Sequence, residues 1–237
     1  MIAENSTSGQ GLKQETAGSN SFWEDETGIS LEDAGEYYSF FADVFLTPIP
    51  ATGKERLKQL QEATEEFFPY QEQQPENDES LPGVALMNAF FKEAAADPEA
   101  FQEQLARDRA CLFSGVDGQE LLPPYASNWS GEDGAVRLSK VQAYYALVPE
   151  FSVAKDTGER DDYIGVEFAF LARLLSREGV MRLVGDGTSA DSFRGTRKDF
   201  LLENVNPWFP AYCEQAVVHA KTDYFKGLLQ AIPSLIL

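Results

Sequence analysis

The stretch Glu159-Arg160-Asp161-Asp162-Tyr163-Ile164-Gly165 joins a loop rich in charged residues to the most apolar helical pattern of the chain. The residues before this stretch have no clean period. After it, apolar side chains recur at helical spacing, at Ile164, Val166, Phe168, Phe170, Leu171, Leu174 and Leu175. We therefore predict a hinge loop at residues 149–160, between an N-terminal helical part at 30–148 and a C-terminal helical part at 161–237.

Helical spacing also dominates the rest of the sequence. Ser30 is a plausible N-cap for a first helix, which Pro48 ends. No strand-like alternation of useful length appears, so the expected fold class is all-α, a helical bundle. Residues 1–29 are polar, and a disordered or loosely attached tail is expected there. Further helices are expected at 54–68, 81–96, 98–113 and 136–148, from Asp161 or Asp162 to 177, from Asp191 or Ser192 to 204, and as one long final helix from Pro207 to Pro233.

The formal net charge is −20, and the excess of acid lies in the first half of the chain. Residues 1–136 hold 26 acidic and 7 basic side chains, whereas residues 137–237 hold 13 and 12. This balance argues against nucleic acid as a partner, because a phosphate-binding surface needs clustered Lys and Arg. A cationic partner such as an Arg-bearing peptide would suit it, and solubility alone would also explain an acidic surface. No apolar run is long enough for a membrane span and no secretory pattern opens the chain, so a cytoplasmic protein is expected.

Several kinds of chemistry have no suitable residues in this sequence. Cys111 and Cys213 are far apart, which favours two buried free thiols over a disulfide or a paired-cysteine metal site. His219 is the only histidine, so a zinc site or a serine or cysteine triad is not expected. The glycine-rich segments 115–118 and 185–188 lack the lysine of a phosphate-binding loop and are interpreted as turns. We therefore expect no metal, no cofactor and no enzymatic activity.

The acids of the hinge are the first candidate binding residues. Asp161 and Asp162 precede a helix, where either could act as a cap, but a cap needs one carboxylate only. The others, with Glu159, are free to pair with guanidinium groups. On a helical wheel Asp162 falls on the solvent face, whereas Glu167 falls inside the apolar arc. A buried Glu167 needs a partner, which would be an Arg from another helix or else a ligand.

The loop Leu121-Leu122-Pro123-Pro124-Tyr125-Ala126-Ser127-Asn128-Trp129 is the second candidate. It is apolar and aromatic, with two prolines. Such a loop can pack back onto a helical bundle as a cap of the core. It can also bind an extended apolar peptide, and the composition alone leaves both interpretations open.

Three motifs, in this order and spacing, resemble the TorD/DmsD/NarJ family of molybdoenzyme chaperones, the redox-enzyme maturation proteins. Residues 109–115 (RACLFSG), followed by 123–129 (PPYASNW), resemble the Leu-Phe-x-Gly and Pro-Pro-aromatic-x-Ser-x-aromatic pair. Residues 159–163 (ERDDY) resemble the hinge motif Glu-Pro-x-Asp-His, and residues 200–210 (FLLENVNPWFP) resemble the Leu-x-x-His-Leu-x-x-Trp-x-Pro turn. The resemblance runs from about residue 31 to the C-terminus. The Pro of the hinge motif is replaced by Arg160, and the His residues of the hinge motif and of the last motif are replaced by Tyr163 and Asn204.

The resemblance implies a TorD-like helical bundle and a cytoplasmic chaperone for a molybdoenzyme. Such a chaperone binds the twin-arginine signal peptide and the apo form of the catalytic subunit, of the DMSO-reductase type, until the molybdenum cofactor is in place. The acids would hold the arginines while the apolar loop receives the apolar part of the peptide. Because Tyr163 cannot gain a charge near neutral pH, no pH-sensitive release is expected. The expected signal-peptide-binding residues are Leu112, Phe113, Pro124, Tyr125, Trp129, Glu159, Asp161, Asp162 and Tyr163.

Two other functions remain open at this point. One is a helical adaptor that binds a folded partner without recognising a signal peptide. The other is a small hydrolase that uses Asp162 and Glu167 as its acid and base. A hinge also permits exchange of parts between protomers, so a monomer and a domain-swapped dimer are both compatible with the sequence.

Overall fold

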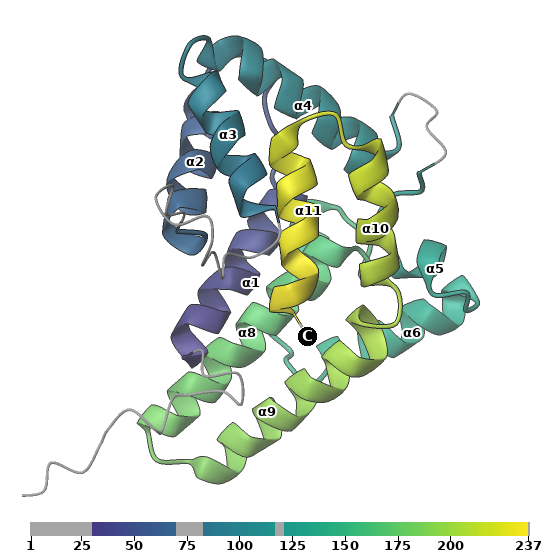
Figure 1. Cartoon of the computed structure of the whole chain (residues 1–237). Helices are drawn as coiled ribbons and strands as arrows, with labels where there is room; N and C mark the ends of the chain where they lie inside the picture. The colour runs from purple at the N-terminus through teal and green to yellow at the C-terminus, as the bar shows by residue number, and fades with distance from the viewer. Residues whose placement is uncertain (1–29, 70–82, 117–120, 237) are drawn as a thin grey trace, which may run out of the picture.

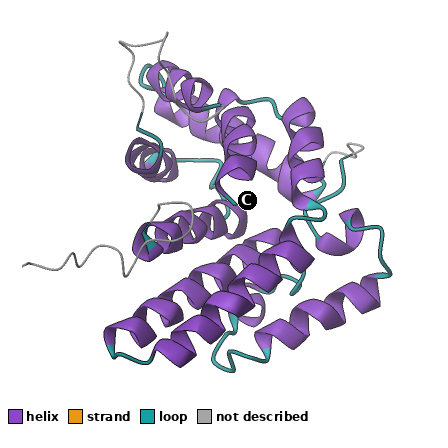
Figure 2. Cartoon of the chain, turned by 60° about the horizontal axis from the view of Figure 1, so that its bottom comes forward, coloured by secondary structure: helices purple, strands orange, loops and turns teal. Residues whose placement is uncertain are grey.

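Helices form the regular structure of the computed structural model, which describes residues 30–69, 83–116 and 121–236 (Figures 1 and 2). No strand occurs among these residues, and Tyr125 and Tyr163 form an isolated antiparallel bridge. The all-α prediction is confirmed, and the expected tail at 1–29 lies outside the described residues. The α-helices are α1 (Leu31–Leu46), α2 (Glu55–Phe67), α3 (Val84–Ala94), α4 (Pro98–Ser114), α5 (Ala126–Trp129), α6 (Gly134–Tyr145), α7 (Val153–Thr157), α8 (Ile164–Leu183), α9 (Gly187–Phe200), α10 (Phe209–His219) and α11 (Asp223–Leu235).

Helix α8 lies at the centre of the packing. It packs lengthwise against α1 and against α9, while α11 packs against α3 and α10 (Figure 1). The apolar residues that the spacing singles out at the start of α8 are buried, as predicted, and burial of each large side chain contributes about 1.5 to 3 kcal/mol. They are Ile164, Val166, Phe168, Phe170, Leu171, Leu174 and Leu175. Because α1 precedes the predicted hinge and α8 follows it, the core crosses the boundary between the two predicted parts. A hinge movement between those parts stays a prediction.

Aromatic rings from distant segments meet around Phe45 of α1. Its ring centroid lies 4.4 Å from that of Phe113 in α4 and 5.9 Å from that of Phe168 in α8. The ring of Phe209 in α10 lies 6.0 Å away, nearly perpendicular. Tilted and edge-on contacts of this kind stabilise a core beyond the area they bury. Phe45 therefore links α1 to α4, α8 and α10.

The final helix differs from the prediction. One long helix was expected, but α10 ends at His219 and α11 begins at Asp223. The carboxylate of Asp108 in α4 accepts hydrogen bonds from the backbone N–H groups of Lys221 and Thr222, at 3.0 and 2.7 Å. Thr222 in turn caps α11. The break is thus held by a residue 113 positions away in the chain, which no local pattern reveals.

Helix α9 and the segment after it also depart from the prediction. The helix begins at Gly187, because the side chain of Asp186 caps it, and not at Asp191 or Ser192. It runs into a π-helical turn, Leu201–Val205. Pro233 was expected to end the last helix, yet α11 continues to Leu235. Two short helices, α5 and α7, lie in segments that were expected to be loops.

Candidate functional site

The two segments singled out in the sequence lie side by side in the structure. Tyr125 and Tyr163 form the antiparallel bridge. The backbone N–H of Ala126 donates to the carbonyl of Asp162 at 2.8 Å, and the N–H of Ile164 donates to the carbonyl of Pro124 at 3.0 Å. The apolar loop is therefore bonded directly to the start of α8.

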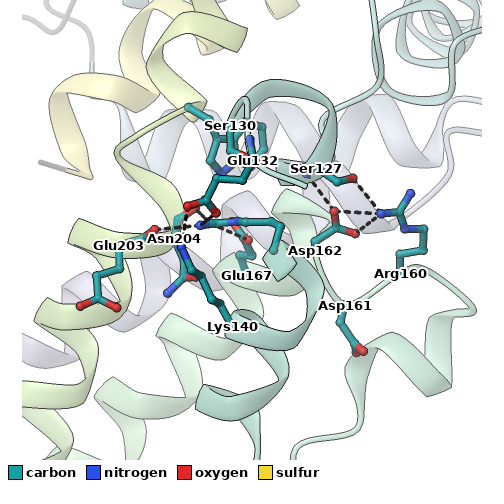
Figure 3. A network of polar contacts seen from close by, with 12 residues as sticks. Ser127, Ser130, Glu132, Lys140, Arg160, Asp161, Asp162, Glu167, Glu203 and Asn204 are labelled. Atoms are coloured by element: carbon teal, nitrogen blue, oxygen red, sulfur yellow. Dashed lines mark hydrogen bonds and ion pairs between the residues drawn. The ribbon is translucent and has the colours of Figure 1, made fainter. Parts of the chain in front are cut away.

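Asp162 is fully buried at this junction. Its Oδ2 accepts a hydrogen bond from the backbone N–H of Ser127 at 3.0 Å and another from Nη2 of Arg160 at 3.0 Å (Figure 3). The expectation that Asp161 or Asp162 caps α8 is wrong, because Tyr163 is the N-cap and no side chain caps it. The expected solvent face for Asp162 is also wrong. A helical wheel applies only to helical residues, and Asp162 precedes the helix.

Arg160 covers Asp162 from the outside. Its Nη2 also donates to Oγ of Ser127 at 2.8 Å, and its guanidinium carbon lies 4.9 Å from the centre of the Tyr125 ring. The hydroxyl of Tyr125 donates to Glu159 at 2.8 Å. Burial, followed by this hydrogen bond, raises the pKa of Tyr125 to about 12. We call Tyr125, Ser127, Glu159, Arg160 and Asp162 the hinge cluster.

One atom of the hinge cluster lacks a hydrogen bond. Oδ1 of Asp162 lies 3.0 Å from Nη2 of Arg160, the same nitrogen that bonds Oδ2, and accepts no hydrogen bond from the described residues. A guanidinium group can instead present two nitrogens to the two oxygens of a carboxylate. Arg160, whose side chain is 52% exposed, therefore engages Asp162 incompletely.

Other predicted binding residues lie in the core. Leu112 and Phe113 are 0% and 2% exposed, so the open apolar surface expected there is not present. Pro124 is buried too. Tyr163 is 2% exposed and donates from its hydroxyl to the carbonyl of Phe45 at 3.0 Å. Burial raises the pKa of Tyr163. Leu112 is one of the buried residues of α4, so it offers no open surface to a peptide.

Asp161 and Trp129 remain at the surface, half-buried. Asp161 accepts a hydrogen bond from Nε2 of Gln142 at 2.8 Å. It lines a cavity of about 340 Å³ whose apolar wall includes Tyr145 and Phe151. The indole N–H of Trp129 donates to the carbonyl of Pro123 at 3.2 Å. Acid and apolar surface thus meet at the rim of this cavity.

Glu167 lies deeper in the molecule and is fully buried. Its Oε1 is 3.9 Å from Nη2 of Arg137, which belongs to α6. Arg137 also donates to the carbonyl of Glu203, at 2.8 Å, and to that of Asn204, both in the π-helical turn. Burial raises the pKa of Glu167 well above its usual range, although the positive charge of Arg137 acts in the opposite direction.

The partner of Glu167 is thus an Arg from another helix, one of the two interpretations that the sequence allows. Arg137, Val141 and Tyr145 are four residues apart in α6 and all three are buried. An arginine on an apolar stripe was the signal that would have identified it. Ser127 could not be identified from such a pattern, because it binds Asp162 through its backbone N–H, a group that every residue except proline carries.

The described residues contain no group of three or more His, Cys, Asp and Glu side chains that could hold a metal ion. Cys111 and Cys213 are both buried thiols. Of the helices that the structure describes, none is long and apolar enough to cross a membrane.

Comparison with known proteins gives the family. Residues 75–214 match the model of the nitrate reductase delta subunit family. The chaperone protein TorD of Vibrio parahaemolyticus is 25% identical over 160 residues, 66% of this chain and 72% of TorD. The selenate reductase assembly chaperone protein of Thauera selenatis is 25% identical over 136 residues, 56% of this chain and 68% of that protein. No solved structure matches.

Both relatives are chaperones, so the prediction of a chaperone family and not an enzyme is confirmed. The matched region contains the hinge cluster, Glu167 and Arg137. The family resemblance inferred from the motifs is confirmed, and the chain belongs to the nitrate reductase delta subunit family.

Proposed function

We propose that this protein is a cytoplasmic chaperone for a molybdenum-containing reductase, and that it binds the twin-arginine signal peptide of that enzyme before export. The two relatives, TorD and the selenate reductase assembly chaperone, support the general role. The hinge cluster supports the signal peptide as the ligand, because its carboxylate, hydroxyl and aromatic ring already surround a guanidinium group, that of Arg160.

A signal-peptide arginine would take the place of Arg160. The carboxylate of Asp162 is held from behind by the N–H of Ser127, so it is fixed in position before the peptide arrives. An incoming guanidinium could bond Oδ1 and Oδ2 with two nitrogens, which Arg160 does not do. Arg160 reaches Asp162 from the solvent side, and an incoming guanidinium would give the buried carboxylate a new charge partner as Arg160 leaves.

The second arginine and the apolar part of the peptide need neighbouring surface. Asp161 offers a carboxylate at the rim of the 340 Å³ cavity, and Tyr145 and Phe151 offer apolar wall. Tyr125 of the hinge cluster and Trp129 at the end of α5 are both half-buried. Leu112, Phe113, Pro124 and Tyr163 would act indirectly, because they anchor the segments that carry these groups.

The two alternatives have less support. A hydrolase needs its two carboxylates in a cleft that substrate can enter, but Asp162 and Glu167 are fully buried and line neither the 340 Å³ nor the 830 Å³ cavity. An adaptor that ignores signal peptides needs no guanidinium site. The hinge cluster is therefore the single observation that favours the signal-peptide chaperone.

Calorimetric titration of the full chain with a twin-arginine signal peptide tests the proposal. Asp162→Asn keeps an acceptor for the N–H of Ser127 but removes the charge, so the peptide should bind more weakly by about 1 to 3 kcal/mol. Asp199→Asn removes an exposed charge of α9 and should leave the affinity unchanged. Equal affinities for Asp162→Asn and the unmodified chain would refute the site.

A further inference from the structure

A groove of about 830 Å³ lies between the first turns of α1 and the second half of α8. Leu31 and Leu175 contribute apolar surface to its lining, and Val180 and Leu183 line it from the last turns of α8. Val180 and Leu183 are 44% and 74% exposed, unusually open for large apolar side chains. At 1.5 Å per residue, the groove begins about 12 Å along α8 from its start at Ile164. It is thus separate from the hinge cluster.

The opposite wall of the groove is acidic. Glu32, Asp33 and Glu36 line it from α1, and all three are exposed. Acids in the first turn stabilise a helix through its dipole, which accounts for Glu32 and Asp33. Glu36 lies beyond that turn, where the dipole effect has faded. The three carboxylates therefore exceed what the helix end requires.

The basic residues nearby are committed elsewhere. Arg173 and Arg177 of α8 pair with Glu150. Arg182 pairs with Glu178 and with Asp191 of α9. No basic side chain lines the groove. Among the described residues, Glu32, Asp33 and Glu36 form no ion pair. The positive charge of α8 is neutralised on its other faces, which leaves the groove acidic.

Small side chains hollow out the groove. Gly35 and Ser39 of α1 face it four residues apart, and Ala172, Ser176 and Gly179 of α8 follow at helical spacing. Small residues in such rows let a third helix approach two others closely, with its side-chain ridges between theirs. The lined length of about two to three turns matches a short helical segment.

We propose that this groove is a second docking site, for a short amphipathic helix of a partner protein with an apolar stripe flanked by Lys or Arg. Its apolar stripe would cover Leu175, Val180 and Leu183, and its basic flank would face Glu32 and Glu36. The chain's own residues 1–29 carry five acids and one lysine, so the acidic wall repels them. A second copy of this chain, at −20, is disfavoured for the same reason.

A dye placed in the groove reports on its occupant. Ser176 is exposed, and the native thiols of Cys111 and Cys213 are buried, so Ser176→Cys can be labelled selectively in the full chain. The probe is a model peptide of about 14 residues, with leucines at helical spacing and lysines on one flank. The dye signal should shift and saturate with this peptide, and should not respond when the lysines are replaced by glutamates.

Charge variants test the acidic wall directly. Glu32→Gln with Glu36→Gln should weaken the probe at least about threefold at low salt, because two facing charges are lost. Glu66→Gln with Glu214→Gln makes the same change in net charge at exposed sites away from the groove and should have no effect. Equal weakening by both pairs of substitutions would overturn the proposal, because the peptide would then respond to the net charge of the protein and not to the acids of the groove.

Three further results would overturn it. The first is no response to the peptide, and the second is a dye already shielded in the free chain, which would mean that residues 1–29 fill the groove. The third is displacement of the probe by a twin-arginine signal peptide, which would merge the groove with the hinge cluster. If the double variant Glu32→Gln with Glu36→Gln binds the signal peptide with unchanged affinity, the two sites are separate. This conclusion does not depend on the affinity that Asp162→Asn shows for the signal peptide.

Discussion

Among single residues, Arg137 connects three parts of the molecule. From α6 it bonds the carbonyls of Glu203 and Asn204 in the π-helical turn and faces the carboxylate of Glu167 in α8. A π-helical turn leaves carbonyls in unusual positions, and a buried guanidinium has enough donors to meet them. Arg137 therefore joins α6, α8 and the segment after α9 at one buried point.

The buried carboxyl group of Glu167 should make the stability of the protein depend on pH. Its pKa is raised above 4.5 by burial, so the folded chain keeps a proton there that the unfolded chain releases. The free energy of unfolding therefore falls as pH rises from 4.5 through the raised pKa, by about 1.4 kcal/mol per pH unit within that window. Glu167→Gln has no such proton, so relative to the unmodified chain it should gain stability as pH rises.

Denaturation by urea at about pH 5 and about pH 8 measures this difference. Glu214→Gln, an exposed acid of α10, is the control and should show no pH-dependent gain. If Glu167→Gln instead lost stability at the higher pH, Glu167 would be ionised in the fold and paired with Arg137.

The helical wheel predicted the burial of Glu167 correctly and that of Asp162 wrongly. Glu167 lies within α8, in its first turn, where the wheel gives its direction correctly. Asp162 lies before the first turn, so its direction depends on the bridge between Tyr125 and Tyr163, a contact that no periodicity contains. The difference between the two carboxylates is thus one of local geometry and not of residue type.

At the scale of elements, α11 crosses the start of α3 with the two backbones in close contact. A Cβ atom on Gly227 would lie 2.3 Å from the carbonyl oxygen of Gly83, and one on Gly83 would lie 2.1 Å from the carbonyl oxygen of Gly227. Both obstacles are backbone atoms, which cannot rotate away. The two segments can approach this closely only because neither residue has a side chain.

We therefore expect Gly227→Ala to destabilise the protein by about 1 to 3 kcal/mol or more, through overpacking at this crossing. Gly195→Ala is the matched control, because Gly195 lies on the exposed side of α9 with no atom within 4 Å of its Cβ position. It should stabilise the helix by about 0.5 to 1 kcal/mol. Urea denaturation compares the two, and equal effects would contradict the steric argument.

Elements were predictable where their signals are local. Ser30 caps α1 and Pro98 opens α4 where the sequence places them. The break between α10 and α11 was missed, since its bonds come from Asp108 in α4. Thr222 before Asp223 was a local cap signal for that break, but the continuous apolar face across it hid the signal.

For the whole molecule, the charge distribution agrees with the proposed ligand. The first 136 residues carry nearly all of the net charge of −20, so they draw a cationic peptide toward the chain. The predicted division into two parts was based on a change of pattern at the hinge. The structure joins those parts in one core, because α1 packs on α8, and pairing between distant helices cannot be derived from the pattern of either helix.

The central claim is that a partner's arginine replaces Arg160 at Asp162. The most direct measurement is the calorimetric affinity of a twin-arginine signal peptide for the unmodified chain and for Arg160→Ala, with and without methylguanidinium. Removal of the internal competitor should tighten binding about twofold to fivefold, and methylguanidinium should compete with the peptide at the vacated site. An affinity that stays the same or falls in Arg160→Ala, with no competition by methylguanidinium, would contradict the account.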